Sequence, residues 1–258
     1  LTLSLLPLRA AQQAPAPARY FPPAGNWEAR NPGQSGFDQA KLDEAVAYAI
    51  AHESTTPKDL ALATPAQFRN EAPYNNLLGP TSTRAGANGL IIRNGYVAAR
   101  WGDTERADMT FSVTKTFLST VAGEAVERRL IKDITDPVST YMPEGVELFK
   151  SEHNAPITWE HLLRQTSDWS GTLWDKPDWA DRPPNCLGPG IPVPNADACR
   201  NRLLHAPGTF YKYNDTRVNV LALSLLYLFK EPLPVVLKRE VMDPIGASSS
   251  WHWEPYSN

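Results

Sequence analysis

Apolar residues recur at intervals of three and four positions in several stretches of the chain. Residues at this spacing lie on one face of a helix, so the pattern predicts amphipathic helices. The predicted helices cover residues 37–52, 112–130, 158–165, 217–230 and 234–241. The fourth is very apolar, but at about 14 residues it is too short to span a bilayer, so we predict a buried core helix.

Two apolar runs around Asn94-Gly95 predict a β-hairpin over residues 89–101, because Asn-Gly is the strongest short turn signal. Residues 53–87 are polar and irregular, which predicts a loop excursion. Residues 169–201 are rich in Trp and Pro and predict a second long loop, of a kind that is usually functional or disordered. A hairpin among helices, with no clear linker, favours an α+β domain with an inserted helical region.

The composition is that of a soluble globular chain of 258 residues, 42% of them hydrophobic, with a formal net charge of −3. A charge this close to neutral gives no reason to expect nucleic acid or an anionic membrane as a partner. The chain has neither a His-Glu-x-x-His motif nor a Cys/His cluster at zinc spacing, so we expect no metal.

Residues 1–11 are apolar and end in small residues, which is typical of the end of a signal peptide; the alternative is a ragged start. We therefore divide the chain into a signal-peptide remnant with a flexible lead-in, residues 1–30, and one folded domain, residues 31–258. An exported protein would be periplasmic or secreted, and a disulfide between Cys186 and Cys199 would then be expected. In a reducing compartment the two would be free thiols.

Ser112 and Lys115 carry the first candidate chemistry, where a polar segment leads into the predicted helix 112–130. Positions i and i+3 share a helix face, so the hydroxyl and the amine would point into the same volume. A hydroxyl is a poor nucleophile until a base takes its proton, and a partly desolvated lysine can be that base. The alternative is that Ser112 only caps the helix, because Ser-x-x-Lys is common by chance.

A tyrosine at the entrance of the predicted helix 217–230 is the second candidate group. Pro207-Gly208 predicts a turn just before it. A phenol near an ammonium group has its phenolate favoured and can relay protons at neutral pH. Tyr211 and Tyr213 are the two candidates, and the alternative is that both are ordinary packing aromatics.

Three motifs in this order resemble the serine hydrolases related to class C β-lactamases, for which Ser-x-x-Lys is a known signature. The group also holds penicillin-binding DD-peptidases, D-aminopeptidases, family VIII carboxylesterases and aminohexanoate-dimer hydrolases. The motifs are Ser112-Val113-Thr114-Lys115, residues 159–167, and the segment from Pro207-Gly208-Thr209 to Tyr213-Asn214-Asp215. The resemblance covers about residue 37 to the C-terminus.

This resemblance implies an α+β fold, an α/β sandwich with a helical subdomain, and two-step acyl transfer that needs no cofactor. By position in the motifs, Ser112 would be the acylated nucleophile and Lys115 its activating base. Tyr213 would relay protons to the leaving group and from water, since its spacing from Pro207-Gly208 fits better than that of Tyr211.

Two features depart from the family pattern. Asp215 stands where asparagine is usual, and a carboxylate close to Lys115 would raise the lysine pKa and oppose its service as a base, unless Tyr213 carries more of the proton traffic. Asp215 could instead anchor that pair by hydrogen bonds, and Asn214 could supply the amide contact. The third family motif, Lys-Thr-Gly or His-x-Gly on a late strand that supplies an oxyanion donor, is not found. We therefore expect a truncated product or a fragment without the C-terminal strands.

Trp169, Trp174 and Trp179 are either scattered core residues or the wall of an acyl-binding cleft. The resemblance of residues 158–179 to esterase-like and nylon-oligomer-hydrolase-like members favours a small-molecule ester or amide as the substrate. A β-lactamase or DD-peptidase is the alternative within the group. A catalytically inactive binding module of the same fold is the alternative from another functional class.

Overall fold

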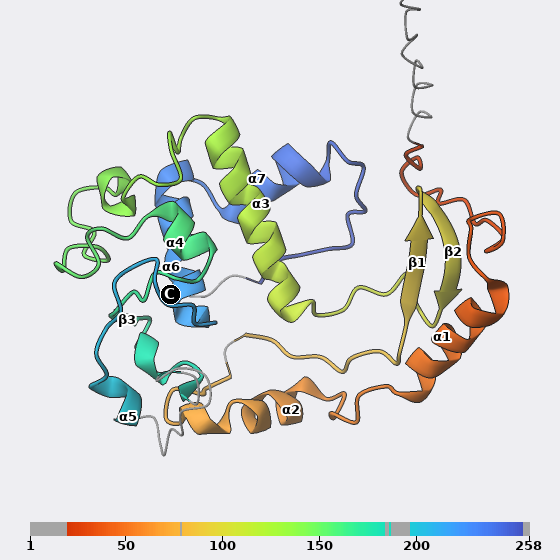
Figure 1. Ribbon diagram of the computed structural model, residues 1–258, viewed down its shortest axis with the longest axis horizontal. Helices are drawn as coiled ribbons and strands as arrows, with labels where there is room; N and C mark the ends of the chain where they lie inside the picture. The colour runs from red at the N-terminus through yellow and green to blue at the C-terminus, as the bar shows by residue number, and fades with distance from the viewer. Residues whose placement is uncertain (1–19, 78, 184–185, 187–196, 255–258) are drawn as a thin grey trace, which may run out of the picture.

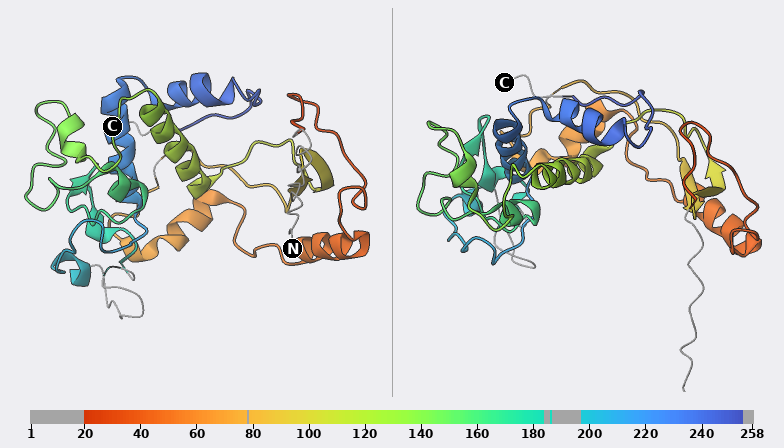
Figure 2. Two further views of the ribbon diagram at one scale, coloured as in Figure 1. Left: turned by 45° about the horizontal axis from the view of Figure 1, so that its top comes forward. Right: turned by 90° about the horizontal axis from the view of Figure 1, so that it is seen from above.

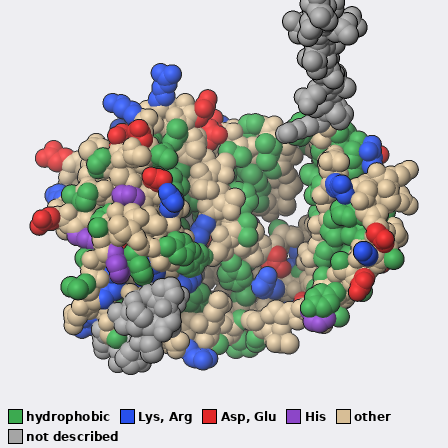
Figure 3. Space-filling view, in the orientation of Figure 1, with side chains coloured by type: hydrophobic (Ala, Val, Ile, Leu, Met, Phe, Trp, Pro, Cys, Tyr) green, Lys and Arg blue, Asp and Glu red, His purple; other side chains and the backbone are tan. Residues whose placement is uncertain are grey.

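The computed structural model describes residues 20–77, 79–183, 186 and 197–254. A helical body lies at one end of the molecule, and a β-hairpin with helix α1 (Gln39–Ala51) lies at the other (Figure 1). Helix α2 (Leu60–Gln67) lies along the segment that connects the two ends, and the turned views keep this arrangement (Figure 2). The space-filling view shows an opening between the hairpin end and the helical body (Figure 3). The predicted signal-peptide remnant lies outside the described residues.

The helical body is built around α3 (Thr114–Glu127), α6 (Asp215–Phe229) and α7 (Leu233–Leu237), which pack against one another. Their buried apolar residues form one cluster: Leu118, Val121, Ala122, Ala125, Val220, Leu221, Leu225, Leu233, Val236 and Leu237. Full burial of a leucine or valine side chain stabilises a fold by about 1.5–3 kcal/mol, so this cluster holds α3 and α6 in a fixed relation.

The predicted helices are confirmed, and their ends have local causes. Asp38 caps α1 by accepting from the backbone N of Lys41 at 3.1 Å. Thr158 and His161 form a reciprocal capping box at α4 (Trp159–Leu163). The predicted helix 234–241 is α7 followed by a π-helical turn, η6 (Lys238–Met242), and the short 3-10 turn η3 (Val138–Tyr141) lies in the link between α3 and α4.

The prediction of a loop over residues 53–87 was wrong in part. This segment contains α2 and the 3-10 turn η1 (Arg69–Glu71). Asp59 caps α2 by accepting from the backbone N of Ala61 at 2.9 Å. Pro65 lies inside the helix, where it removes one helical hydrogen bond and makes the sequence look like a loop.

The described strands form two antiparallel pairs, and with the helices they confirm the α+β class. β1 (Gly89–Arg93) pairs with β2 (Tyr96–Trp101) through a turn in which Asn94 and Gly95 both have positive φ, as an Asn-Gly hairpin turn requires. Residues 169–201, predicted as a loop, hold β3 (Thr172–Leu173), β4 (Lys176–Pro177), the 3-10 turn η4 (Asp178–Ala180) and α5 (Asp197–Arg200).

Within the described residues, no single helix is both long and apolar enough to cross a membrane. Helix α6 and the helical residues 233–242 are long and apolar enough when taken together, but the two parts are bent by 73° relative to each other. The inner face of α6 packs in the cluster described above, as predicted for a core helix.

Candidate active site

Ser112 lies in a 3-10 turn, η2 (Phe111–Val113), that leads directly into α3. The Nζ of Lys115 donates to the Oγ of Ser112 at 3.0 Å, so the two side chains share one face as their spacing predicted. Ser112 is exposed, whereas the side chain of Lys115 is only 23% exposed. The hydroxyl is therefore open to a substrate while the amine beside it is largely desolvated.

The residue before Ser112 has an unusual backbone conformation. Phe111 has a φ of 48°, in the left-handed region, which costs a bulky residue about 1–3 kcal/mol. Its ring lies 5.4 Å from the guanidinium carbon of Arg84. Such strain persists only where the surrounding structure holds it, so the entrance to α3 is constrained at the position of Ser112.

Tyr213, which lies just before α6 and 101 residues later in the chain, reaches the same hydroxyl. Its phenol donates to the Oγ of Ser112 at 2.5 Å, and its ring centroid lies 4.8 Å from the Nζ of Lys115. The structure thus brings the predicted hydroxyl, amine and phenol together, while Tyr211 is exposed and forms no part of this contact. Ser112 accepts both hydrogen bonds, so its activation requires Lys115 or Tyr213 first to give up a proton.

Asp215, the first residue of α6, determines the charge of Lys115. Its Oδ1 lies 2.7 Å from the Nζ of Lys115. Burial lowers the pKa of Lys115, but its interactions with Asp215 and Tyr213 outweigh burial and leave the pKa above its usual value. The amine is therefore an ammonium at neutral pH, which is the effect predicted for an aspartate at this position.

Arg182 is a third charged member of the site, beside Lys115 and Asp215, and the sequence did not indicate it. Its NH2 donates to Oδ2 of Asp215 at 2.7 Å, and its Cζ lies 4.7 Å from the Tyr213 ring centroid. Burial raises the pKa of the Asp215 carboxyl, but Arg182 and Lys115 outweigh burial and hold it below its usual value. No motif or periodicity marks Arg182, which lies in the Pro-rich stretch after η4.

Asn214 is placed differently from its prediction. Its Oδ1 caps α6 by accepting from the backbone N of Arg217 at 3.0 Å, and its Nδ2 donates to the carbonyl of Asp178 at 2.9 Å. The side chain is fully buried. Its amide is therefore engaged by the protein, and the predicted amide contact in the site is not made by Asn214.

A buried ionic layer lies behind the site. Asp181 accepts from Lys176, from Arg182 and from the backbone N of Asp215, each at 2.8–2.9 Å. Glu71 accepts from Lys176 at 2.6 Å and from the backbone N of Arg182 at 3.0 Å. Glu71 and Asp181 are almost completely buried, so this layer connects η1 to the residues around Ser112.

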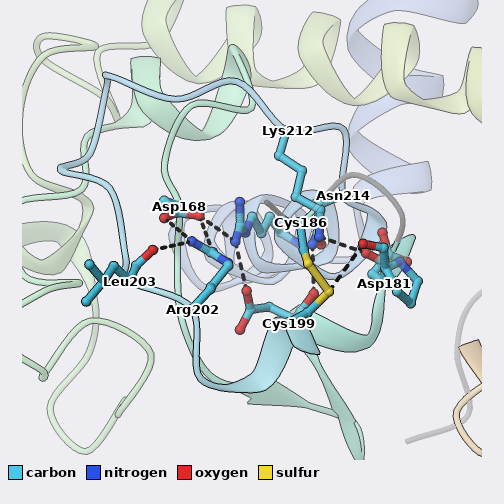
Figure 4. Close-up of a disulfide and its surroundings, with 11 residues drawn as sticks. Asp168, Asp181, Cys186, Cys199, Arg202, Leu203, Lys212 and Asn214 are labelled. Carbon is cyan, nitrogen blue, oxygen red and sulfur yellow. Dashed lines mark hydrogen bonds and ion pairs between the residues drawn. A yellow bond between two sulfur atoms is a disulfide. The ribbon is translucent and has the colours of Figure 1, made fainter. Parts of the chain in front are cut away.

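Lys212 is a buried lysine just before Tyr213. Its Nζ donates to the carbonyl of Asp181 at 2.8 Å, and both residues are labelled in Figure 4. Burial, followed by the charge of Arg217, lowers its pKa to about 8. This contact holds the carbonyl of Asp181, the residue just before Arg182.

Cys186 and Cys199 form a disulfide next to a second buried ion cluster (Figure 4). Asp168 is fully buried and accepts from Arg202 and from the backbone N of His205, and it lies 2.8 Å from Arg217. Burial raises the pKa of Asp168, but the arginines and the backbone donor outweigh burial and hold it at about 2.

The three tryptophans differ in environment. Trp169 is 2% exposed and donates from Nε1 to the carbonyl of Leu148 at 2.7 Å, so it is a core residue rather than a cleft wall. Trp174 packs against the main cluster. Trp179 meets the edge of Tyr74 and lies under Arg200. Of the two alternatives left open by the sequence, the structure places Trp169 in the core, because its indole is enclosed by the helical body.

Among the described residues, no group of three or more His, Cys, Asp or Glu side chains is arranged to hold a metal ion.

Residues 74–258 match the family model described as Beta-lactamase. A β-lactamase/D-alanine carboxypeptidase from Yersinia pestis is 21% identical, with a TM-score of 0.35 over 52% of this chain and 37% of that chain. EstCE1, a hydrolase with promiscuous acyltransferase activity, is 22% identical, with a TM-score of 0.38 over 61% and 45%.

An octameric penicillin-binding protein homologue from Pyrococcus abyssi is 19% identical, with a TM-score of 0.36 over 52% of this chain and 30% of that chain. The chain thus spans less than half the length of each of these three solved proteins. A search of curated proteins found no match.

Proposed function

The chain belongs to the beta-lactamase family of hydrolases, and from this premise we propose that it cleaves an ester or small amide through an acyl-enzyme on Ser112. Its fold is the α+β fold of β-lactamases and penicillin-binding proteins. The observation that carries the proposal is the convergence of two groups on one exposed hydroxyl. Tyr213 and Lys115 lie 2.5 Å and 3.0 Å from the Oγ of Ser112.

Tyr213 is the group that moves protons in this proposal, because Asp215 keeps Lys115 as an ammonium at neutral pH. Tyr213 first loses its phenolic proton to solvent, and the phenolate, beside the cations of Lys115 and Arg182, then takes the proton from Ser112. The Oγ of Ser112 then bonds to the carbonyl carbon. Tyr213 returns the proton to the leaving oxygen or nitrogen as that bond breaks.

Water completes the reaction in the second step. Tyr213, again a phenolate, takes a proton from the water that attacks the acyl carbon, and the bond from that carbon to Ser112 breaks. Tyr213 then returns the proton to the Oγ of Ser112. Lys115 holds the phenol and the hydroxyl together through both steps and offsets the negative charge that develops.

Labelling with a fluorophosphonate probe tests the nucleophile. The wild type is expected to be labelled, and Ser112→Ala is expected to abolish labelling. Ser119→Ala is the matched control, because Ser119 is also exposed on α3 but its hydroxyl donates to the carbonyl of Thr116 in its own helix. Labelling that survives Ser112→Ala would remove Ser112 from the mechanism.

The substrate class is tested with two chromogenic compounds. We expect hydrolysis of p-nitrophenyl butyrate and little hydrolysis of nitrocefin. The reverse result would assign the site to β-lactams. A folded wild type that neither takes the probe nor hydrolyses either compound would favour an inactive binding module.

The periplasmic or secreted location is part of the same proposal. It is supported by the disulfide between Cys186 and Cys199, because disulfides persist mainly in oxidising compartments. Protein purified from its native source without reductant is expected to show no free thiol after denaturation. Two free thiols per chain would contradict an exported location.

A further inference from the structure

The proposed reaction places negative charge at Tyr213 and then on the substrate oxygen, yet a carboxylate lies close by. Asp215 and Lys115 alone form a pair of zero net charge, so the carboxylate offsets part of the help that Lys115 gives to a developing anion. A further positive group close to Tyr213 would make up for that loss.

Arg182 is placed to be this group. One nitrogen of its guanidinium donates to Asp215 at 2.7 Å and the other donates to Asp181 at 2.8 Å. Its Cζ also lies over the Tyr213 ring, 4.7 Å from the centroid. A planar guanidinium can reach two carboxylates with separate nitrogens while it stacks on an aromatic ring, a rigid fork that a lysine ammonium does not have.

The backbone of Arg182 is held as firmly as its side chain. Its N–H donates to buried Glu71 at 3.0 Å, and its φ of 47° lies in the left-handed region. A non-glycine residue in this region costs about 1–3 kcal/mol and is kept only where its surroundings determine it. The carbonyl before it, that of Asp181, is bound by Lys212.

The charges around Arg182 alternate through the buried layer. In order they are Lys115, Asp215, Arg182, Asp181, Lys176 and Glu71, so three cations face three carboxylates. Lys212 adds a seventh charge at the carbonyl of Asp181 when protonated. The two cations that lie against the Tyr213 ring are Lys115 and Arg182, so the catalytic phenol stands at the positive end of this layer.

We infer that Arg182 is a positioning residue for the Ser112 centre. It holds the Asp215 carboxylate between two cations and places a second cation beside the Tyr213 ring. This inference rests on the proposed function and assigns a specific role to a residue outside the three motifs.

The test is the pH profile of kcat/KM for p-nitrophenyl butyrate in three proteins: wild type, Arg182→Gln and Arg182→Lys. For Arg182→Gln we expect the acidic limb of the kcat/KM profile to shift to higher pH by about 1–2 units. We also expect kcat to fall about tenfold or more, with a smaller change in KM. Arg182→Lys keeps the positive charge but loses the two guanidinium nitrogens that donate to separate carboxylates. Its acidic limb should therefore stay near that of the wild type, while its kcat should still be lower than that of the wild type. A purely structural role would lower activity without moving the limb.

Arg164→Gln is the control, because Arg164 also pairs with a carboxylate, Glu160, but on the exposed surface of α4. It should leave both kcat and the limb unchanged. A wild-type profile for Arg182→Gln would overturn the inference. If Arg182→Gln does not fold, Arg182→Lys decides alone, since an unchanged kcat in that variant would also overturn it.

The two proposals fail in different ways. If the wild type is not labelled at Ser112 by the fluorophosphonate, the proposed function fails. If the wild type is labelled and active but the Arg182 variants match it, only the role of Arg182 fails.

Discussion

At the scale of single residues, the charge of Lys115 depends on a contest between burial and Asp215. Burial by itself would make the amine a better base, but the carboxylate at 2.7 Å stabilises the ammonium. The two groups therefore have different roles: Lys115 is a fixed cation that stabilises anions, and the phenol of Tyr213 exchanges protons. The departure from asparagine at position 215 therefore has a physical consequence for the mechanism.

Asp215→Asn tests this division. Without the carboxylate, burial lowers the pKa of Lys115, so the ammonium is lost at a lower pH than in the wild type. We expect the alkaline limb of the kcat/KM profile, measured from pH 7 to 11, to move to lower pH. Asp175→Asn, at an exposed position, is the control. An alkaline limb that does not move would show that Asp215 does not set the charge of Lys115.

Lys212 should give the folded protein a distinct pH dependence of stability. Its pKa is about 8 in the folded chain and 10.5 as the usual value, so between these pH values only the unfolded chain keeps the proton. Stability rises with pH wherever the unfolded state binds more protons. The free energy of unfolding of the wild type, minus that of Lys212→Met, should therefore rise between pH 8 and 10. The slope is at most about 1.4 kcal/mol per pH unit.

Urea unfolding at several pH values measures this difference. The subtraction cancels the titration of groups that both proteins share. The charged neighbours of Lys212, namely Arg217, Asp181, Asp178 and Arg202, are present in both proteins. A difference that stays constant from pH 8 to 10 would mean that Lys212 keeps its proton in the fold.

At the scale of elements, the entrance of α6 has both a structural and a chemical role. Asn214 caps the helix, and the residues on either side of it, Tyr213 and Asp215, are the ones that reach Ser112 and Lys115. The cap thus fixes the direction in which its two neighbours leave the backbone. Stability and activity should therefore be coupled at this helix end.

Asn214→Ala is expected to lower both quantities. The loss of the cap and of the buried bond to Asp178 should reduce the free energy of unfolding by about 1–3 kcal/mol. The kcat should fall as well, because Tyr213 is no longer held in place. Urea unfolding and turnover of p-nitrophenyl butyrate measure the two effects.

Asp38→Ala is the matched control, since Asp38 caps α1 far from Ser112. It should destabilise the protein by about 0.5–2 kcal/mol and leave kcat unchanged. Equal losses of kcat in both variants would show that activity follows stability alone, without a specific role for the entrance of α6.

At the scale of the whole molecule, local signals predicted what lies close together in the sequence. Helical periodicity predicted α1, α3 and α6, and a spacing of three residues placed Lys115 beside Ser112. Tyr213 was predicted only through its motif, since periodicity does not report on contacts across 101 residues.

Arg182 and Glu71 could not be predicted in this way. Both lie in irregular segments without a repeating pattern, and both act through partners distant in the chain: Asp215 for Arg182 and Lys176 for Glu71. Trp169 was open to two interpretations because composition does not distinguish a tryptophan in a core from one in a cleft. Its environment is clear only from the structure, in which its indole N–H donates to the carbonyl of Leu148.

Glu71 is a buried contact between the segment with α2 and the helical body. Its carboxylate binds Lys176 and the backbone of Arg182, so the connecting segment and the Ser112 site are held by the same group. Glu71→Gln removes the charge and keeps one acceptor for the backbone N of Arg182. We expect the free energy of unfolding to fall by about 1–3 kcal/mol, because Lys176 keeps only Asp181 as a charged partner. We also expect faster trypsin cleavage within residues 53–87.

Glu105→Gln is the control, because Glu105 is 84% exposed and pairs with Arg100 on the surface of the hairpin end, where an ion pair contributes little. The urea midpoint and the cleavage rate should both be unchanged in this variant. If Glu71→Gln lowers the midpoint without faster cleavage, the contact stabilises the body alone. If neither changes, Glu71 does not hold the connecting segment, and Arg182 must be positioned by its side-chain contacts with Asp181 and Asp215.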